Sequence, residues 1–243
     1  MSISKPRTGE QNPAAKHIKF KNGSFTYYDR DKEENIVIPL PIEFTVIDEL
    51  AAVAGWHEKS KSGIYSNEVA STMSDELIVS SWKGGEIARG FYGDIKDKIK
   101  AEGGRYEKSV YAVLKGELVR FGFVGAALSA WIEKEVNFTK PLFTVKETKE
   151  GKKGATVYQI PIFEASECTQ EEWSEAVEID KNILQPYLDS KDIDTKTLSE
   201  GMEESHDIRE QNAQCAAEHG TAAAKAEVAE SMEEEVDDDL LPF

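Results

Sequence analysis

The sequence has few of the residues from which metal sites and disulfides are built. Its 243 residues include two cysteines, Cys168 and Cys215, and four histidines, which are His17, His57, His206 and His219. No Cys-x-x-Cys pair is present and the histidines lack metal-ligand spacing, so we interpret them as surface residues and expect no metal. Two cysteines so far apart, in a chain without a secretory signal, are more typical of reduced thiols than of a disulfide.

The common motifs of nucleotide-binding and hydrolytic enzymes are also missing. Residues 82–93, WKGGEIARGFYG, are rich in glycine but have no lysine in the register of a phosphate-binding loop. No Gly-x-Ser-x-Gly or His-Glu-x-x-His sequence occurs. Acidic residues are frequent, but most of their pairs lie in the last third of the chain, where solvation explains them. The sequence therefore offers no positive argument for an enzyme or a cofactor.

Long hydrophobic runs are absent. The N-terminal segment MSISKPRTGEQNPAAK is polar and contains no apolar stretch of the kind found in signal peptides. No run approaches the roughly 18 apolar residues that a membrane-spanning helix needs. We therefore expect a soluble, cytoplasmic protein with no membrane partner.

Charged residues of both signs are plentiful, but they are unevenly placed. The whole chain has a formal net charge of −17. Residues 1–165 carry 24 Lys and Arg against 23 Asp and Glu, whereas residues 166–243 carry 5 against 23. A nearly neutral body is thus followed by a strongly acidic last third.

Composition divides the chain into three zones. Residues 1–15 are rich in Ser, Pro, Gly and charge and are predicted to be a flexible arm. Residues 16–189 are predicted to be a β-rich body that ends in a helix. Residues 190–243 contain almost no aromatic side chain before Phe243 and cannot bury enough apolar surface to offset the entropy of ordering. We expect them to form a disordered acidic tail.

Alternation and turn residues predict the strands of the body. Asn22–Gly23 separates two apolar segments, and Asn-Gly is typical of a hairpin turn. Apolar residues alternate over 36–46, which predicts one half-buried strand. Pro39 and Pro41 lie within it, so it should be an edge strand or bulged there. Further strand candidates are residues 63–72, 76–82 and 106–125.

Two short helices are predicted inside the body. Residues 94–104 form the first, with Asp94 as its cap and two glycines at its end. Residues 125–136 form the second, with three side chains facing inward, namely Leu128, Trp131 and Ile132.

A hairpin and a third helix are predicted to follow. Residues 142–147 and 155–163 are expected to pair with each other across a Lys-Lys-Gly turn. Thr169 and Glu172 have the spacing of a capping box, which predicts the start of a helix. We expect this helix to end near Pro186, because proline interrupts the hydrogen bonds of a helix.

This set of elements is compatible with an OB fold, a partly open five-stranded barrel whose face and loops bind oligonucleotides. The pattern alone does not separate it from other small β-barrels. We therefore expect a mainly β protein with short helices, built as an OB-fold-like small β-barrel with a C-terminal helix and a disordered acidic tail.

Aromatic and basic side chains alternate along residues 56–120 in the way that single-strand binding requires. Cations follow the phosphates, and aromatic rings stack on bases at roughly 1–3 kcal/mol each without preference for one base. The candidate DNA-binding residues are Trp56, Lys59, Lys61, Tyr65, Trp82, Lys83, Arg89, Tyr92, Arg105 and Tyr111.

The competing interpretation is that these rings fill the core while the lysines cover the surface. Trp56 lies in the polar segment GWHEKSKSG, and Trp82 precedes Lys-Gly-Gly. Both tryptophans are therefore expected at strand ends, and they are the stronger stacking candidates.

The last residues of the sequence, VDDDLLPF, combine an acidic run with an apolar end. They closely resemble the acidic C-terminal tip of bacterial single-stranded DNA-binding proteins, with an additional leucine before Pro-Phe. The resemblance is confined to this tip, and the body matches that family in no stretch. The candidate protein-docking residues are Asp237, Asp238, Asp239, Leu240, Leu241, Pro242 and Phe243.

Taken together, the sequence resembles a tailed-phage single-stranded DNA-binding protein, with an OB-fold body and a bacterial type of tip. The resemblance implies a protein of the host-cell cytoplasm that coats strands exposed in DNA replication, recombination and repair, and recruits partner proteins through its tip. We expect Phe243 to enter an apolar pocket while its carboxylate pairs with a basic residue. A flexible tail of roughly 50 residues reaches about 40 Å, so it could also compete with DNA for the body.

Two other interpretations remain open on the sequence alone. The chain could be an acidic adaptor without DNA binding of its own, which docks on a replication protein such as a sliding clamp through its Leu-Leu-Pro-Phe end. It could also be an enzyme acting on nucleic acid that uses the tail for recruitment, although no ligand cluster supports this.

Overall fold

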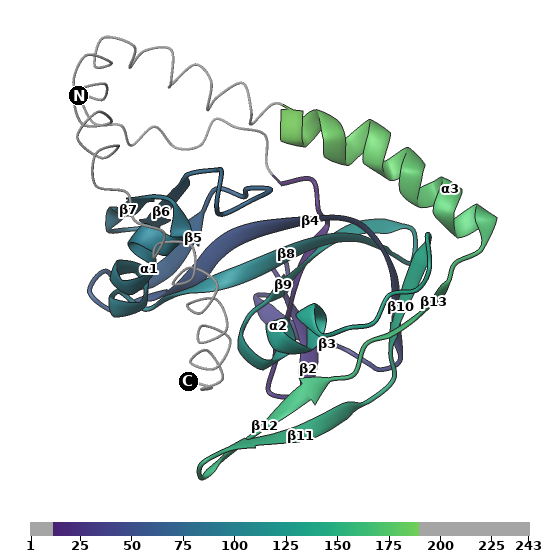
Figure 1. Ribbon diagram of the computed structural model, residues 1–243, viewed down its shortest axis with the longest axis horizontal. Coiled ribbons are helices and arrows are strands. Elements are labelled where there is room, and N and C mark those ends of the chain that lie inside the picture. Colours follow the sequence, from purple (N-terminus) through teal and green to yellow (C-terminus); the bar gives the residue numbers. More distant parts are fainter. Residues whose placement is uncertain (1–11, 190–243) are drawn as a thin grey trace, which may run out of the picture.

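A computed structural model of the chain describes residues 12–189. The predicted disordered tail, its docking tip, Cys215 and most of the predicted N-terminal arm lie outside the described residues. Within residues 12–189 the chain is mainly β with short helices, as predicted (Figure 1). None of the described helices is long and apolar enough to cross a membrane.

Eleven strands form one sheet. Nine of them lie side by side in the order β3 (Glu34–Ile38), β2 (Ser24–Asp29), β1 (Lys16–Lys21), β9 (Glu117–Phe123), β8 (Gly104–Leu114), β4 (Ile42–His57), β5 (Ser62–Ser66), β6 (Leu77–Ser81) and β7 (Gly85–Gly90). A branch is added where β10 (Pro141–Val145) pairs with the first part of β4 and with β13 (Glu164–Glu167). Pairing is antiparallel throughout except between β1 and β9.

The expected OB-fold-like barrel is wrong, because this sheet is not closed. Within residues 12–189, β3 and β7 each pair on one side only, and β13 ends the branch. The reason lies in β4, which is 16 residues long. Its first part pairs with β10 and its last part with β5, so the sheet continues in two directions instead of returning on itself.

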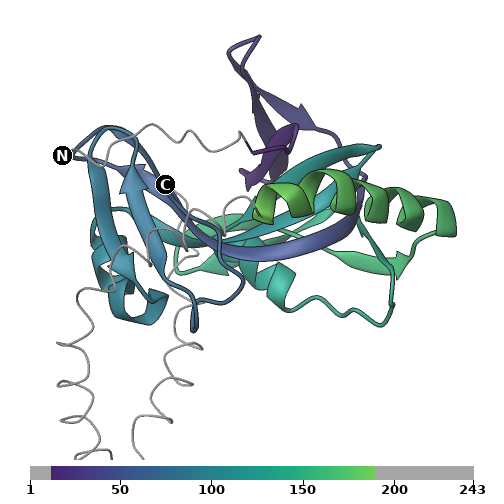
Figure 2. The same ribbon diagram turned by 90° about the horizontal axis from the view of Figure 1, so that it is seen from above.

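Two hydrophobic clusters lie on one face of the sheet, which we call the inner face. One cluster contains side chains of β1, β2, β4, β8, β9 and β10 and of the helix α2 (Gly125–Ile132). It includes Phe44, Phe121 and Trp131. The other contains side chains of the four strands β4, β5, β6 and β7 and of the helix α1 (Tyr92–Ala101). It includes Val79 and Ile99. Seen from above, the two helices lie on the same side of the long strand β4 (Figure 2).

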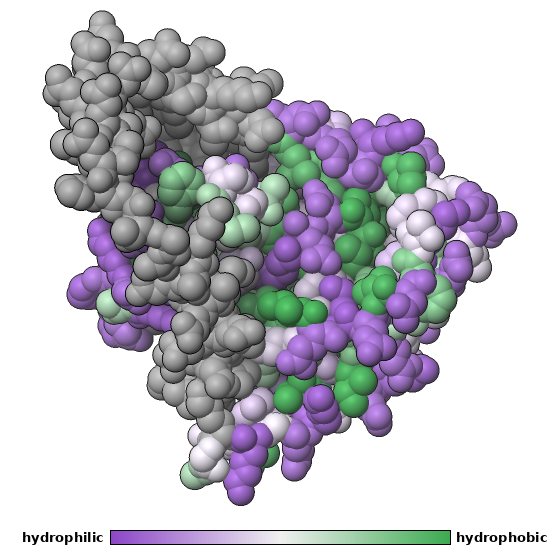
Figure 3. All heavy atoms as spheres, viewed as in Figure 1, coloured by the Kyte–Doolittle hydropathy of each residue, from purple (hydrophilic) through white to green (hydrophobic). Residues whose placement is uncertain are grey.

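The opposite, outer face is covered at one end by the C-terminal helical segment. This segment consists of α3 (Gln170–Ile179), the π-helical turn η1 (Asp180–Leu184) and helical residues 185–189. Leu184 and Tyr187 pack on Tyr111 and its neighbours in a third hydrophobic cluster. On the side seen in Figure 3, exposed hydrophobic side chains form small groups among hydrophilic ones.

The ends of α3 test two predictions. The capping box is confirmed: the Glu172 backbone N–H donates to Thr169 Oγ1 at 3.2 Å, and the Glu172 carboxylate accepts from the Thr169 backbone N–H at 2.7 Å. The prediction that the helix ends near Pro186 is wrong, because the chain stays helical through Asp189. Burial of Leu184 and Tyr187 on both sides of the proline holds the segment against the sheet.

The predicted hairpin turn is confirmed, whereas the single strand predicted through two prolines is wrong. Asn22 and Gly23 have φ of 51° and 79° and form the predicted hairpin turn between β1 and β2. The single strand predicted over 36–46 is instead divided into β3 and β4. Pro39 and Pro41 have no backbone N–H to contribute to a ladder, so the strand is interrupted between them.

Three further predictions about the body are also wrong. Helix α1 begins at Tyr92 with Phe91 as its N-cap, so Asp94 lies in the first turn and is not the cap. Ile132, at the last position of α2, is 60% exposed. The late hairpin is formed by β11 (Thr148–Lys153) and β12 (Thr156–Pro161), and β10 joins the main sheet instead.

Candidate nucleic-acid interface

The two tryptophans singled out in the sequence lie together at one end of the sheet. Trp56 is the penultimate residue of β4, and Trp82 follows the last residue of β6, so their predicted position at strand ends is confirmed. Trp56 is paired with Gly63 of β5, whose carbonyl accepts from the Trp82 backbone N–H at 3.1 Å. The two residues are 51% and 66% exposed.

Tyr65 belongs to the same group of rings. Its ring centroid lies 4.3 Å from that of Trp82, with 37° between the ring planes. A Cβ atom added at Gly63 would lie 3.3 Å from Trp82 Cδ1, closer than side chains usually approach. The absence of a side chain at Gly63 therefore leaves the space in which the indole rests beside Tyr65.

The turn after Trp56 is held by a histidine at the end of β4. His57 Nδ1 lies 2.6 Å from Ser60 Oγ, and His57 Nε2 lies 3.1 Å from the Glu102 carboxylate at the end of α1. Ser60 Oγ in turn contacts the hydroxyl of Ser62 at 2.8 Å. Ser60, His57 and Glu102 contact one another in the order of a hydrolytic triad. Here, however, Ser60 is also in contact with further serines, so the contacts form a network. Their visible effect is to join the turn to α1.

Serine hydroxyls fix the turn after Trp82 in a similar way. Ser62 Oγ accepts from the backbone N–H of Lys83 at 3.2 Å, and Ser81 Oγ accepts from that of Gly84 at 2.9 Å. The backbone on both sides of the exposed rings is thus held by hydrogen bonds. A ring presented in this way loses little conformational entropy when it stacks on a ligand.

Of the predicted cations, Lys59 and Lys61 lie in the turn after Trp56 and Arg89 lies on β7, and all three have acidic partners. Lys59 donates to Glu102 at 2.6 Å, Arg89 donates to Glu86 at 2.9 Å, and Lys61 pairs with Glu58. The hydrogen bond from Lys59 is the main reason that the pKa of Glu102 is lowered, and the bond to Glu86 raises the pKa of Arg89. Exposed pairs of this kind contribute little to stability, so a phosphate can replace the carboxylate at small cost.

The other two predicted cations are placed differently. Lys83 is exposed in the turn directly after Trp82. Arg105 lies on β8 opposite Ala54 of β4, and Ala54 is opposite Tyr65 of β5. Because directly paired residues share a face of a sheet, Arg105 lies on the same face as the Tyr65 ring.

Two predicted residues, Tyr92 and Tyr111, do not belong to this surface. Tyr92 is 7% exposed and packs edge-to-face on Tyr106 in the inner cluster, with 5.2 Å between the ring centroids. Tyr111 is fully buried, and its hydroxyl donates to the Glu68 carboxylate at 2.6 Å. Burial and the Glu68 charge raise the pKa of Tyr111. Neither ring is accessible to a base, so both are withdrawn from the candidate site.

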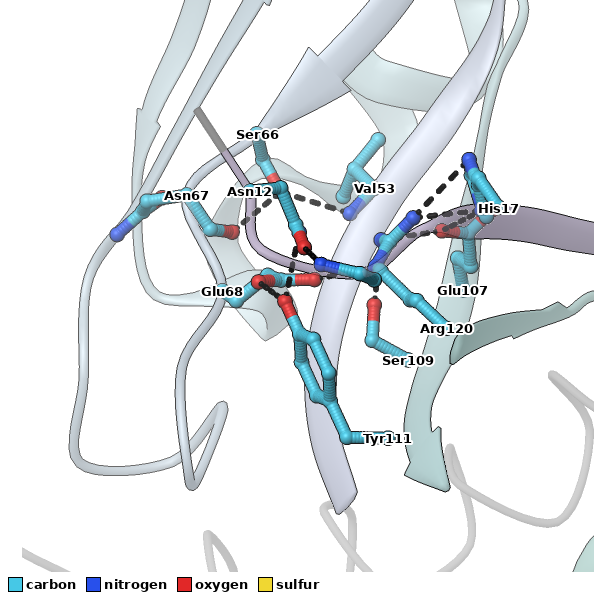
Figure 4. Close-up of polar contacts among 11 residues, drawn as sticks. Asn12, His17, Val53, Ser66, Asn67, Glu68, Glu107, Ser109, Tyr111 and Arg120 are labelled. Atoms are coloured by element: carbon cyan, nitrogen blue, oxygen red, sulfur yellow. Dashed lines mark hydrogen bonds and ion pairs between the residues drawn. The ribbon is translucent and has the colours of Figure 1, made fainter. Parts of the chain in front are cut away.

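A buried polar group that sequence reasoning did not single out occupies the centre of the outer face (Figure 4). The Arg120 guanidinium donates to Glu68 at 2.5 Å, to Glu107 at 2.7 Å and to Ser109 at 2.5 Å. Burial alone would lower the pKa of Arg120, but the two carboxylates raise it. The β5–β6 loop, which carries Glu68, is thereby attached to the sheet.

The edge of this group is formed by His17 of β1. Arg120 Nη1 lies 2.6 Å from His17 Nε2, which must therefore accept. Partial burial of the ring is the main cause that lowers the pKa of His17, and the positive charges of Arg120 and Lys19 lower it further. The imidazole is thus held neutral beside two cations.

Residues 12–15 also lie against the outer face. Asn12 Nδ2 donates to Tyr111 Oη at 2.8 Å, and the backbone N–H of Ala15 donates to the carbonyl of Leu118 at 2.8 Å. The part of the predicted arm that the structure describes is therefore in contact with the sheet.

Within residues 12–189, no group of three or more His, Cys, Asp and Glu side chains could hold a metal ion. Cys168 is a free, buried thiol, and its burial raises its pKa.

No family model, curated protein or solved structure matches this chain. The interpretation of the site therefore depends on the geometry of the rings and on the charges around them.

Proposed function

We propose that this chain binds single-stranded DNA without sequence preference, and that it protects strands exposed in DNA replication or recombination. The observation that carries the proposal is the ring group formed by two exposed tryptophans, Trp56 and Trp82, and the half-buried Tyr65. The two tryptophans border hydrogen-bonded turns at one end of the sheet, and these turns carry Lys59, Lys61 and Lys83. A single strand offers unpaired bases to such rings and phosphates to such lysines.

Tolerance of sequence follows from the kind of contact. Stacking uses the face of a base, and every base has such a face, whereas discrimination requires hydrogen bonds to base edges. We further propose that the acidic C-terminal segment and its Asp-Asp-Asp-Leu-Leu-Pro-Phe end recruit replication, recombination or repair proteins in the cytoplasm, and that the segment competes with DNA for the body. We assign no catalytic activity to the chain.

Replacing single tryptophans tests the DNA-binding part of this proposal. Trp56→Ala and Trp82→Ala are each expected to weaken binding of a single-stranded oligonucleotide by roughly 1–3 kcal/mol, the usual value of one stacked base. Trp173→Ala, on α3, removes the same ring from outside the site and should leave affinity unchanged. Fluorescence anisotropy of a labelled oligothymidylate measures all three, and circular dichroism melting checks that each variant is folded.

The outcome also separates the competing functions. Unchanged affinity in both folded site variants would remove this ring group from the interface. No binding by the unaltered chain would favour the acidic adaptor that docks on a replication protein without DNA binding.

A further inference from the structure

We propose that the single strand continues from the ring group across the outer face to a second contact region on β1 and β2, formed by Lys19, Lys21 and Tyr28. The inference rests on the proposed function and extends it, because it assigns a path to the bound strand.

Strand β1 supplies the cations of this region. Its sequence, KHIKFK, contains three lysines and a histidine and no acidic residue. Ile18 is fully buried in the inner cluster and Phe20 packs against it. Successive side chains of a strand point to opposite faces, so Lys19 and Lys21 lie on the outer face. Both are exposed.

Strands β2 and β3 supply the flat surface. Phe25 of β2 is fully buried in the inner cluster, so Tyr28, an odd number of residues away, lies on the outer face. Tyr28 is 56% exposed, and Val37 of β3 is 58% exposed on the same face. Because Lys19 is directly opposite Thr26, the cations and the exposed ring lie on neighbouring strands.

Register connects this region to the ring group. Lys19 is opposite Gly122 of β9, and Gly122 is opposite Ser109 of β8. Arg105 lies an even number of residues before Ser109 on β8, so the two share a face. Arg105 is opposite Ala54 of β4, which is opposite Tyr65 of β5. Lys19 and Tyr65 therefore share the outer face.

The separation suits one bound strand. Four strand spacings of about 4.8 Å and about 13 Å along β8 place Tyr65 and Lys19 roughly 23 Å apart on an ideal flat sheet. For a strand that keeps the stacked spacing of duplex DNA, about 3.4 Å per nucleotide, this corresponds to roughly seven nucleotides, within the range of about 4–16 found for single-strand binding domains.

The cations that can attract a polyanion lie at the two ends of the path. The positive charge of Arg120 at the centre is offset by Glu68 and Glu107, which are hydrogen-bonded to it. The positive charge of Lys19 lowers the pKa of the nearby His17, which is itself neutral. Cations that can meet phosphates are therefore found at both ends of the path, and the buried group between them has a formal net charge of −1, from one guanidinium and two carboxylates.

Oligonucleotides of two lengths, with the full chain, test the proposal. The probes are oligothymidylates of about 5 and about 20 nucleotides, and quenching of tryptophan fluorescence reports on the ring group, since β1 and β2 contain no tryptophan. Tyr28→Ala and the double variant Lys19→Ala with Lys21→Ala should each weaken binding of the long probe at least about fivefold, which is the lower end of one stacked base. Both should leave binding of the short probe unchanged.

The salt dependence gives a second readout. Removing two phosphate contacts should reduce the slope of log K against log salt for the long probe by about 1.4, since each contact contributes about 0.7 on single strands. The matched control is Lys149→Ala with Lys152→Ala on the separate β11–β12 hairpin, which removes the same charge and should change neither readout.

Each contrary outcome is distinct. Equal losses for both probes, or no loss for the long one, would overturn the second region. An altered oligomeric state without a change in DNA affinity would assign Tyr28 to contact with a second copy of the chain and would also overturn it. Failure of the proposed function is recognised separately, because the unaltered chain would then bind neither probe.

Discussion

The ring of Trp82 lies beside that of Tyr65 with 4.3 Å between their centroids, although Tyr65 belongs to β5 and Trp82 to the turn after β6. Gly63, beside Trp82, contributes no side chain, and its backbone carbonyl accepts a hydrogen bond from the Trp82 backbone N–H. The pair is thus a preformed aromatic surface whose outer side remains exposed.

Gly63→Val is expected to displace the indole, because the new Cβ would lie 3.3 Å from Trp82 Cδ1 and the branched side chain would extend further. Affinity for a single-stranded oligonucleotide should fall by about 1 kcal/mol, the scale of one aromatic pair. Gly93→Ala is the control, since a Cβ there meets no other atom within 4 Å. Anisotropy titration measures both. If Gly63→Val binds as well as the unaltered chain, the position of Trp82 beside Tyr65 does not matter for binding.

Arg120→Met should strongly destabilise the fold, because Glu68 and Glu107 would be left as buried carboxylates without a cation. We expect a loss of about 3–5 kcal/mol in the free energy of unfolding, measured by urea denaturation. The control is Lys146→Met, which breaks the exposed pair with Glu164 and should cost under about 1 kcal/mol. Similar values for the two variants would show that the Arg120 group is not a buried network in solution.

Stability should depend on pH through His17. Its pKa is lowered in the folded protein, so below about pH 6.5 the unfolded chain binds a proton that the folded chain does not. The free energy of unfolding should therefore be unaffected by this group above that pH. It should decrease as the pH falls from there toward the lowered pKa.

The size and control of this effect follow from the environment of His17. Its side chain is 39% exposed, so the slope should lie well below the limit of about 1.4 kcal/mol per pH unit. His17→Gln removes the titrating group, and its stability should change less between pH 7 and 5 in urea denaturation. Parallel curves for the two proteins would contradict the prediction.

Deletion of Phe243 should abolish binding of partner proteins and leave single-strand affinity nearly unchanged, because the proposed DNA contacts lie in the body. Loss of one anchoring ring typically costs about 2–4 kcal/mol at an interface. A residue appended after Phe243 should do similar damage by moving the terminal carboxylate. Pull-downs from cell extract compare the three proteins, and recovery of the same partners by all of them would exclude a docking tip.

Local signals determined several elements from the sequence alone. Asn22–Gly23 supplies the positive φ values of a hairpin turn, and Thr169 with Glu172 satisfies the free N–H groups of a helix start, so neither needs a distant partner. Polar neighbours likewise placed Trp56 and Trp82 at strand ends. Alternation over residues 36–46 was a poorer guide, because Pro39 and Pro41 interrupt the strand that it predicts.

Tertiary structure decided which side of each strand is covered. Tyr65 and Tyr111 are both strand residues on the outer face, but the C-terminal helical segment packs over Tyr111 and buries it fully, whereas Tyr65 is half-buried and the neighbouring Trp82 is 66% exposed. The alternation of basic and apolar residues in β1 could have indicated that Lys19 and Lys21 share a face. It could not show that this face continues to the ring group, because the parallel pairing of β1 with β9 joins residues about a hundred positions apart. Closure of the sheet is likewise a matter of long-range pairing, and no local propensity specifies which edge a strand will meet.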